Sequence, residues 1–212
     1  MKEQVFGLDR VDLTNVLGVA QLELPSEGFV QCGDEVLESL SSLGQFRRRD
    51  TAETDETFKQ LIPYVVMKNA LGRILCTERT KGGADSRLHN KIAIGIGGHI
   101  NPVDDTKREF IVEEAMTREV QEETSIGADD IAQVTFMGII NNDTDPVGRV
   151  HLGLLYVIEV RGNIVIPIKE THKLRGFMVG RDDLSKYEDR MEVWTKLVYP
   201  LISGTFDKDA TA

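Results

Sequence analysis

Three glutamates, Glu119, Glu122 and Glu123, lie within five positions of the segment REVQEETSI, directly after Arg118. On a helix of 3.6 residues per turn, the second and third lie about 60° and 40° to either side of the first, so all three carboxylates share one face. Like charges at this spacing destabilise an isolated helix by a few tenths of a kcal/mol per pair. A hard cation such as Mg²⁺ would offset this repulsion, because it binds carboxylate oxygens and commonly those of a phosphate chain as well.

The sequence before these glutamates indicates a turn that leads into an amphipathic helix. In KIAIGIGGHI, an apolar alternation typical of a strand ends in Gly97 and Gly98. EFIVEEAMTREVQEETSI (109–126) then repeats apolar residues at helical spacing and has acids elsewhere. The apolar face consists of Val112, Ala115, Met116 and Val120. Acidic helix faces are commonly only solvated, so a metal site is favoured by the order of the whole segment and not by the glutamates alone.

That order resembles the Nudix box, which runs G, five residues, E, seven residues and then R-E-U-x-E-E-x-G-U, where U is a bulky aliphatic residue. Gly98 in GIGGH matches the first glycine. The end of the motif is matched in order and spacing by Arg118, Glu119, Val120, Glu122, Glu123 and Ile126. Within this superfamily, the chain resembles a group of predicted bacterial Nudix phosphoesterases with a divergent box.

The resemblance implies a hydrolase that cleaves a diphosphate linked to another moiety, such as a nucleoside diphosphate derivative, with Mg²⁺ or Mn²⁺ as cofactor. Glu119, Glu122 and Glu123 would hold the metal and are, with Arg118, the candidate catalytic residues. One of the glutamates, or a later one, would be the general base for water, and the arginine would brace the helix.

Two features before the arginine depart from the family pattern. Phe110 occupies the position that should be Glu, with seven residues between it and Arg118, and eleven residues separate it from Gly98 where the family has five, an apparent insertion of six. Glu114, one helical turn before the arginine, is the expected substitute partner. Asn101 lies where many relatives carry a glutamate, which predicts the loss of one metal ligand or water contact.

A third departure lies at the end of the box. Ser125 replaces the glycine that usually closes the helix in a left-handed conformation. We therefore expect Gly127 to close a slightly longer helix.

The candidate substrate-binding residues are Gly97, Gly98, His99, Arg149 and His151. His99 follows the double glycine and would contact a phosphate or a base; the alternative is a turn histidine bonded to the backbone. His151 would line the pocket from a strand face or be a satisfied core histidine. Arg149 would supply a cation for a phosphate chain.

Strand-like runs at 61–67, 73–79, 133–140, 149–160, 163–168 and 176–180 alternate with helical patterns at 34–44, 109–126 and 183–202. This order predicts an α/β fold, and the resemblance implies a Nudix-like α/β/α sandwich with a mixed β-sheet, plus an N-terminal α+β segment. We expect an N-terminal segment at 1–55 that packs on the main domain, a Nudix-like domain at 56–205 and a flexible tail at 206–212.

Composition excludes several other classes of protein. The formal net charge is −10 and the pI about 4.9 over 212 residues, which disfavours unspecific binding to nucleic acid or an anionic membrane. Two cysteines, Cys32 and Cys76, are too few for a disulfide scaffold or a structural zinc site. With no apolar run typical of a signal peptide or a membrane span, we expect a soluble cytoplasmic protein whose partner is a small-molecule diphosphate, and dimerisation stays open.

Two other functions stay open. A Nudix-like binding or regulatory domain would keep a ligand but lack turnover, which Phe110 and Ser125 favour. An enzyme that resembles isopentenyl diphosphate isomerase would need a reactive cysteine that faces the metal, and Cys76 is the candidate. The retained REVQEE favours the hydrolase, because a chain without activity has no reason to keep three mutually repelling carboxylates.

Overall fold

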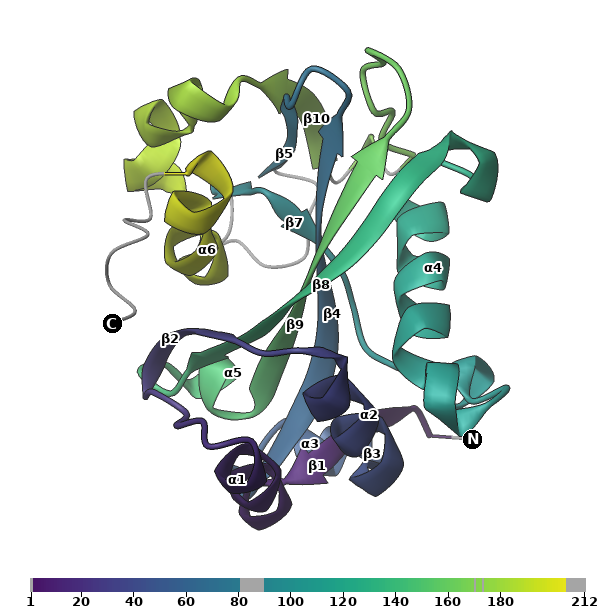
Figure 1. Ribbon diagram of the computed structural model, residues 1–212, viewed down its shortest axis with the longest axis vertical. Coiled ribbons are helices and arrows are strands. Elements are labelled where there is room, and N and C mark those ends of the chain that lie inside the picture. Colours follow the sequence, from purple (N-terminus) through teal and green to yellow (C-terminus); the bar gives the residue numbers. More distant parts are fainter. Residues whose placement is uncertain (1, 81–89, 170, 173, 205–212) are drawn as a thin grey trace. The chain divides into compact units, whose positions relative to one another are not determined.

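The protein is described by a computed structural model that covers residues 2–80, 90–169, 171–172 and 174–204. The predicted tail at 206–212 lies outside the described residues. The chain forms two compact units, whose helices and strands are labelled in Figure 1. The first comprises Met1–Val65, Gly97–Val120 and Thr135–Tyr156, and the second comprises Val66–Ile96, Gln121–Val134 and Val157–Ala212. Strands β4 (Phe58–Asn69), β8 (Ile131–Asn142) and β9 (His151–Val160) and helix α4 (Ile111–Glu123) contribute residues to both units.

The first unit contains the N-terminal elements of the chain. They are β1 (Gln4–Asp9), α1 (Arg10–Val19), β2 (Glu27–Gln31), α2 (Asp34–Leu43), β3 (Gln45–Arg48) and α3 (Arg49–Ala52). It also contains the 3₁₀ turns Pro102–Asp104 and Arg108–Phe110 and the short helix α5 (Pro146–Arg149).

Sheet pairing joins the N-terminal segment to β4 inside the first unit. β1 is antiparallel to β3, with Phe6 opposite Phe46, and antiparallel to β4, with Gly7 opposite Gln60. β2 is antiparallel to β8. Buried Val5, Ala52 and Phe58 pack together where β1, α3 and β4 meet. The predicted boundary at residues 55 and 56 stays a prediction.

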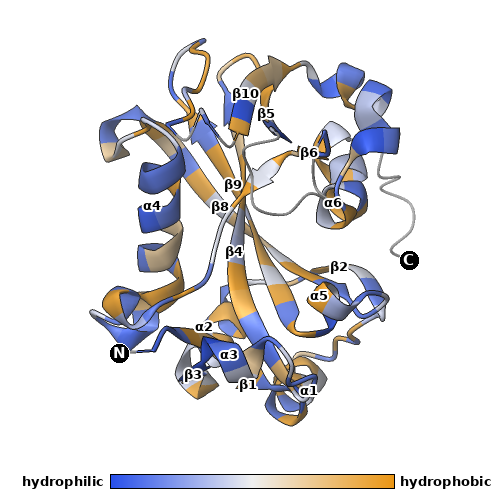
Figure 2. Ribbon diagram, turned by 180° about the vertical axis from the view of Figure 1, so that it is seen from behind, coloured by the Kyte–Doolittle hydropathy of each residue, from blue (hydrophilic) through white to orange (hydrophobic). Residues whose placement is uncertain are grey.

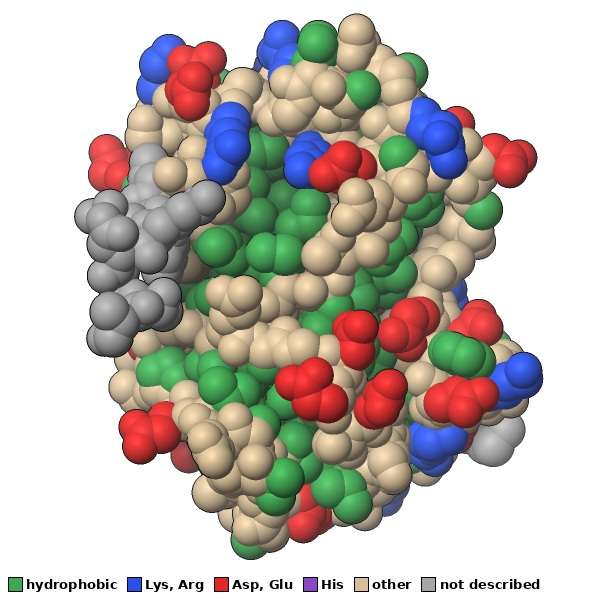
Figure 3. Space-filling model, in the orientation of Figure 1, with side chains coloured by type: hydrophobic (Ala, Val, Ile, Leu, Met, Phe, Trp, Pro, Cys, Tyr) green, Lys and Arg blue, Asp and Glu red, His purple; other side chains and the backbone are tan. Residues whose placement is uncertain are grey.

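The helix expected at 34–44 forms as α2, because its apolar residues recur at helical spacing and are buried on one face. Val36, Leu37 and Leu40 are buried, whereas Leu43 is 54% exposed. The acids of α2 lie on its exposed side, and Figure 3 shows acidic side chains in the part of this face where Figure 1 draws the helix. Among the described residues, every helix is too short or too polar to cross a bilayer.

The second unit is built around the hairpin of β4 and β5 (Ile74–Arg79), and these strands confirm the strand-like runs predicted at 61–67 and 73–79. Lys68 pairs with Ile74, and Gly72 takes φ of +70°, a conformation that glycine adopts without steric cost. β5 also pairs with β10 (Leu174–Val179) and β6 (Ile92–Ala93). The other elements are β7 (Gly95–Ile96), the 3₁₀ segments Ala128–Asp130 and Arg181–Arg190, and α6 (Val193–Ser203).

Two sequence-based expectations in the second unit were wrong. The run 163–168 forms no strand; only Ile168 makes an isolated bridge, with Thr124. The expected single helix at 183–202 is a 3₁₀ segment followed by α6. The interruption has a physical cause: Met191 is buried and bridges Ile92, and the Glu192 N–H donates to the Ile92 carbonyl, so the chain pairs as a strand at this point.

Candidate active site

Helix α4 carries the arginine and the three glutamates of the predicted site. Its buried residues are Ile111, Val112, Ala115, Met116 and Val120. Figure 2 shows hydrophilic residues along the helix. Arg118 and Glu119 are half-buried in the first unit. Glu122 and Glu123, on the following turn, are in the second unit.

Arg118 forms a bidentate ion pair with Asp104. Its Nε lies 2.8 Å from Asp104 Oδ1, and its Nη2 lies 3.0 Å from Oδ2. Nη2 also donates to the His99 carbonyl at 2.8 Å, and Nη1 donates to Glu119 Oε1 at 2.7 Å. The hydrogen bond with the Asp104 carboxylate raises the pKa of Arg118, although partial burial opposes the shift. The arginine therefore ties α4 to the turn after the double glycine.

The ion-pair partner of Arg118 is Asp104 and not the predicted Glu114. Glu114 is exposed and accepts a hydrogen bond from Thr106. Asp104 follows Gly98 after five residues, the spacing that the family has between glycine and glutamate. The insertion of six residues therefore lies after this acid and not before it. Phe110 replaces no functional residue; it ends a 3₁₀ turn and is 48% exposed.

Two hydrogen bonds with Asn101 hold Asp104 in place. The Asp104 carboxylate is 3% exposed, and its Oδ2 accepts the Asn101 backbone N–H at 2.7 Å. The Asp104 N–H donates to the Asn101 backbone carbonyl at 2.9 Å, whereas the buried Asn101 Oδ1 has no hydrogen-bond partner among the described residues. These bonds close the turn Pro102–Asp104 and direct the acid toward Arg118.

The double glycine is required by its surroundings. A Cβ at Gly97 would collide with the Pro63 carbonyl oxygen, and a Cβ at Gly98 would collide with the Glu119 carboxylate. Gly98 therefore leaves the space that Glu119 occupies, and the Glu119 side chain is 13% exposed. An alanine at either position would force the backbone or the carboxylate to move.

The end of α4 lies in the second unit and differs from the expectation. The helix stops at Glu123, and Gly127 has φ of −103°, so it does not close a longer helix. The segment after β9 supplies the missing donors instead: Lys169 N–H donates to the Glu123 carbonyl at 2.8 Å, and Lys169 Nζ donates to the Gln121 carbonyl at 2.6 Å. Ser125 N–H donates to the Pro167 carbonyl at 3.2 Å. The two Lys169 bonds satisfy helix-terminal carbonyls without a left-handed residue, and the Ser125 bond holds the chain after the helix.

The structure brings His99 and His151 together in the first unit. Their Nε2 atoms are 3.2 Å apart, and His151 Nδ1 lies 2.8 Å from the Val147 carbonyl oxygen. Burial lowers the pKa of His99 to about 4, with further contributions from the charges of Arg49 and His151. Burial also lowers the pKa of His151. Both rings are therefore neutral near pH 7.

A carboxylate that sequence reasoning missed completes this pair. One oxygen of Glu53, which follows α3, lies with a ring nitrogen of His99 and one of His151 in a group whose atoms are all within 4.8 Å of one another. The three residues are far apart in the chain, and only the loop between β3 and β4 brings the acid to the histidines. In the sequence, the one signal for this group was the position of His99 directly after the double glycine.

Arg149, the other predicted substrate-binding residue, is held by an ion pair. Its Nε lies 2.6 Å from Glu56 Oε1, and its side chain is 33% exposed. Nearby, Lys59 is buried and its Nζ donates to Asp143 and to the carbonyls of Gly148 and His151. These contacts fix the chain that leads into β9.

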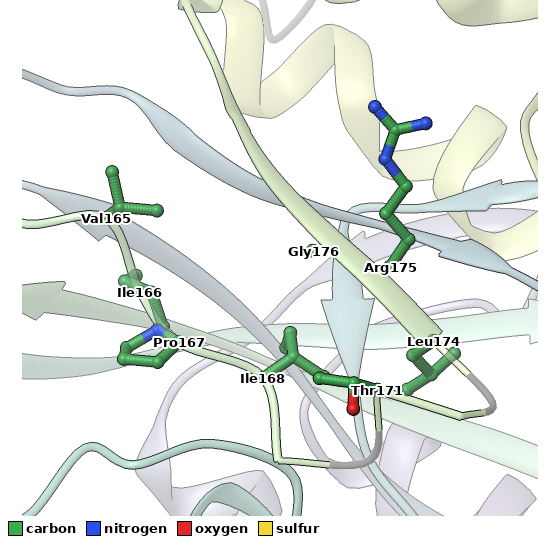
Figure 4. A pocket seen from close by; sticks show the side chains of 8 residues that line it. All are labelled: Val165, Ile166, Pro167, Ile168, Thr171, Leu174, Arg175 and Gly176. Carbon is green, nitrogen blue, oxygen red and sulfur yellow. The ribbon is translucent and has the colours of Figure 1, made fainter.

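A pocket of about 290 Å³ lies wholly in the second unit. Most of its lining is apolar, with Val165, Ile166, Pro167, Ile168 and Leu174 (Figure 4). Figure 4 shows the Arg175 side chain directed away from these residues. Cys76 is also in this unit, on β5. It is fully buried, and burial raises the pKa of its thiol to about 12, which disfavours the isomerase-like alternative because a thiolate is needed for reactivity.

The α/β fold with its mixed sheet, together with the glycine, acid, arginine and glutamate order, defines the Nudix class. Residues 59–201 match the model of the NUDIX domain, so the chain belongs to this family. Nudix enzymes hydrolyse nucleoside diphosphates that are linked to another moiety. Membership of this family therefore indicates a hydrolase.

Known proteins are similar to this chain in sequence and in fold. The chain is 33% identical to protein YmaB of Bacillus subtilis (strain 168) over 171 residues, which is 79% of this chain and 82% of the relative. The crystal structure of Tm1382, described as a candidate Nudix hydrolase, has a TM-score of 0.80 and 31% identity and covers 96% of this chain and all of that one. The structure of DR0079 from Deinococcus radiodurans, at 16% identity and a TM-score of 0.53, covers 85% of this chain and 99% of that one and shares the fold.

Proposed function

We propose that the protein is a Mg²⁺-dependent hydrolase of a diphosphate linked to another moiety, such as a nucleoside diphosphate derivative. The observation that carries the proposal is the arrangement of Arg118, Asp104 and Glu119 beside Gly98. A half-buried guanidinium joins the glycine turn to the helix, and the glycine leaves room for the carboxylate. That arrangement restores the part of the box that Phe110 seemed to remove.

The donor set of α4 fits a hard cation. Glu119, Glu122 and Glu123 offer only carboxylate oxygens, which Mg²⁺ and Mn²⁺ prefer. Helical spacing places them on one side of α4. A bound cation would shield the pyrophosphate and lower the pKa of the attacking water.

The protein's own groups would hold and orient the reactants. In this proposal Arg118 keeps α4 against the glycine turn, because its guanidinium bonds the His99 carbonyl and Asp104 together. Gly97 and Gly98 allow close approach to the substrate. One of the three glutamates, or a later acid, accepts the proton of water as general base.

His99, Arg149 and His151 complete the proposed substrate-binding set. The two histidines lie beside the Gly98 turn and are neutral, so they offer no charge. Both ring nitrogens of His151 are engaged, with the Val147 carbonyl and with His99, so His151 would orient His99 toward the substrate. Arg149 is the cation of the set, and binding a phosphate would require it to exchange the Glu56 carboxylate for the substrate. That exchange costs little, because the Glu56 side chain is 59% exposed.

The test is product release from a panel of nucleoside and non-nucleoside diphosphates, each with Mg²⁺, with Mn²⁺ and with EDTA. We expect phosphate or monophosphate release from at least one substrate, dependent on the metal. A rise in melting temperature with some member of the panel, without any product, would instead support a binding or regulatory domain, because a ligand stabilises the folded state whether or not it reacts.

A further inference from the structure

A second group of metal-ligand type lies in the first unit, apart from the three glutamates of α4. Glu53, His99 and His151 come from the turn after α3, the turn after Gly98 and the first position of β9. Each offers one ligand atom, and these atoms all lie within 4.8 Å of one another. Two imidazoles and one carboxylate are a donor set that binds zinc in proteins.

The hydrogen bonding of His151 selects its tautomer. Its Nδ1 lies 2.8 Å from the Val147 carbonyl oxygen, which can only accept, so Nδ1 carries the proton. Nε2 of the neutral ring then has the lone pair, and this is the atom that faces His99. Histidines that bind metals commonly donate their other N–H to a backbone carbonyl in this manner.

The separation of the two rings agrees with a shared ion. Two nitrogens at 2.0–2.1 Å from a tetrahedral metal are about 3.3 Å apart. The Nε2 atoms of His99 and His151 are 3.2 Å apart. The alternative is a direct N–H···N bond, which requires the proton of His99 to lie on Nε2 and predicts no response to metal.

Arg49 and Lys59 are cations close to the site, and each is paired with a carboxylate. Lys59 Nζ lies 2.8 Å from Asp143 Oδ1. Arg49 Nε lies 3.1 Å from Glu53 Oε1 and Arg49 Nη1 lies 2.8 Å from Glu3 Oε1. To bind a cation, Glu53 would exchange the Arg49 contact for the metal while Glu3 keeps the arginine paired. The Glu53 side chain is 39% exposed, so the contact that it gives up is weak.

We propose that Glu53, His99 and His151 form a binding site for a divalent transition metal of the zinc type, with a fourth position for water or a ligand. The site needs no cysteine, which is why cysteine counting did not predict it. It would fasten the turn after α3 to the start of β9. Carboxylates alone suit Mg²⁺, whereas imidazole suits zinc, so the two sites would take different metals.

The experiment is a titration of the full chain with Co²⁺ and Zn²⁺, with Mg²⁺ present in excess to occupy carboxylate sites. We expect one Co²⁺ per chain with the visible absorption of a four-coordinate ion, displaced by Zn²⁺, and a higher melting temperature with Zn²⁺. His99→Gln and Glu53→Gln should weaken binding, by about 100-fold or more for the histidine and at least 10-fold for the glutamate.

Two variants provide matched controls. His172→Gln changes an exposed histidine and Glu122→Gln changes a glutamate of α4; both should bind Co²⁺ as the native chain does. Since Glu53 is exposed, Glu53→Gln tests the site even if a histidine variant fails to fold. Binding lost in Glu122→Gln or His172→Gln, or no stoichiometric Co²⁺ binding by the native chain, would overturn the proposal. Because the readout is spectroscopic, neither result depends on hydrolase activity.

Discussion

The two ends of the Nudix box depart from the family pattern in sequence, and the structure compensates for them in different ways. Before the arginine, a side chain does so: Asp104 pairs with Arg118 through two hydrogen bonds. After the glutamates, the backbone is involved: Pro167 O accepts the Ser125 N–H, and Lys169 N–H donates to Glu123 O. The first compensation depends on one residue type, whereas the second depends largely on the path of the chain.

This difference teaches where the box tolerates substitution. A buried ion pair fails when one partner is removed, because the other charge is left without compensation. Backbone hydrogen bonds survive most side-chain changes. We therefore expect large effects at Asp104 and small effects at Ser125, although both belong to departures from the same motif.

The largest effect is expected for Asp104→Ala. This change removes both carboxylate bonds to Arg118, whose side chain is only 22% exposed, so it should lower the free energy of unfolding by about 3 to 5 kcal/mol. Urea denaturation measures the loss. The matched control is Phe110→Glu, which places an acid at the position suggested by the sequence and should leave stability nearly unchanged in the native chain. Rescue of Asp104→Ala by Phe110→Glu would show that the insertion lies before Phe110 after all.

An intermediate effect is expected at Lys59, whose Nζ bonds both a side-chain carboxylate and backbone carbonyls. Burial lowers the pKa of this lysine to about 8, although the bond with Asp143 opposes the shift. The unfolded chain therefore binds more protons between about pH 8 and 10.5, and this residue should make the free energy of unfolding rise with pH there by about 2 to 3 kcal/mol.

The check is urea denaturation of the native chain and of Lys59→Met at several pH values from 7 to 10.5. The difference between the two curves isolates the lysine from other groups that titrate in this range. Parallel curves would contradict the prediction, because they would mean that the lysine has the same pKa in the folded and unfolded chains.

The smallest effect is expected for Ser125→Gly. Since the structure places no left-handed residue at position 125, glycine brings only extra freedom of the unfolded chain, and the free energy of unfolding should fall by about 0.5 to 1 kcal/mol or less. Gly72→Ala is the comparison, because Gly72 has φ of +70° and open space around it; it should lose about 1 kcal/mol or more. A chain stabilised by Ser125→Gly would indicate a left-handed helix end and refute the backbone cap.

Local patterns predicted the elements whose stability is local. Helix α2, strands β4 and β5, and helix α4 were predicted correctly because the periodicity of their apolar residues determines them. The end of α4 and the break at Met191 were wrong, because distant backbone partners at residues 167–169 and at Ile92 decide them. Such partners leave no signal in the local sequence.

The site divides in the same way. The sequence alone identified Gly98 and the segment REVQEE as parts of the box. It also contained the signal for Asp104, which follows Gly98 after five residues, but that signal emerges only when the insertion is placed after the acid. Glu53 was not readable, because it reaches His99 and His151 only through the fold. The sequence therefore indicated the residues that one helix carries and also His99 and His151, but not Glu53, the acid that a third segment brings to the two histidines.

We propose above all that the acidic face of α4 performs metal-dependent hydrolysis. The most direct measurement is kcat/KM with Mg²⁺ for Glu122→Gln against Glu114→Gln, an exposed glutamate on the same helix. The account predicts a loss of roughly 100-fold or more for Glu122→Gln, the scale expected when a metal site or general base is disrupted, and no more than a small change for Glu114→Gln. Equal activities in the two variants would contradict it.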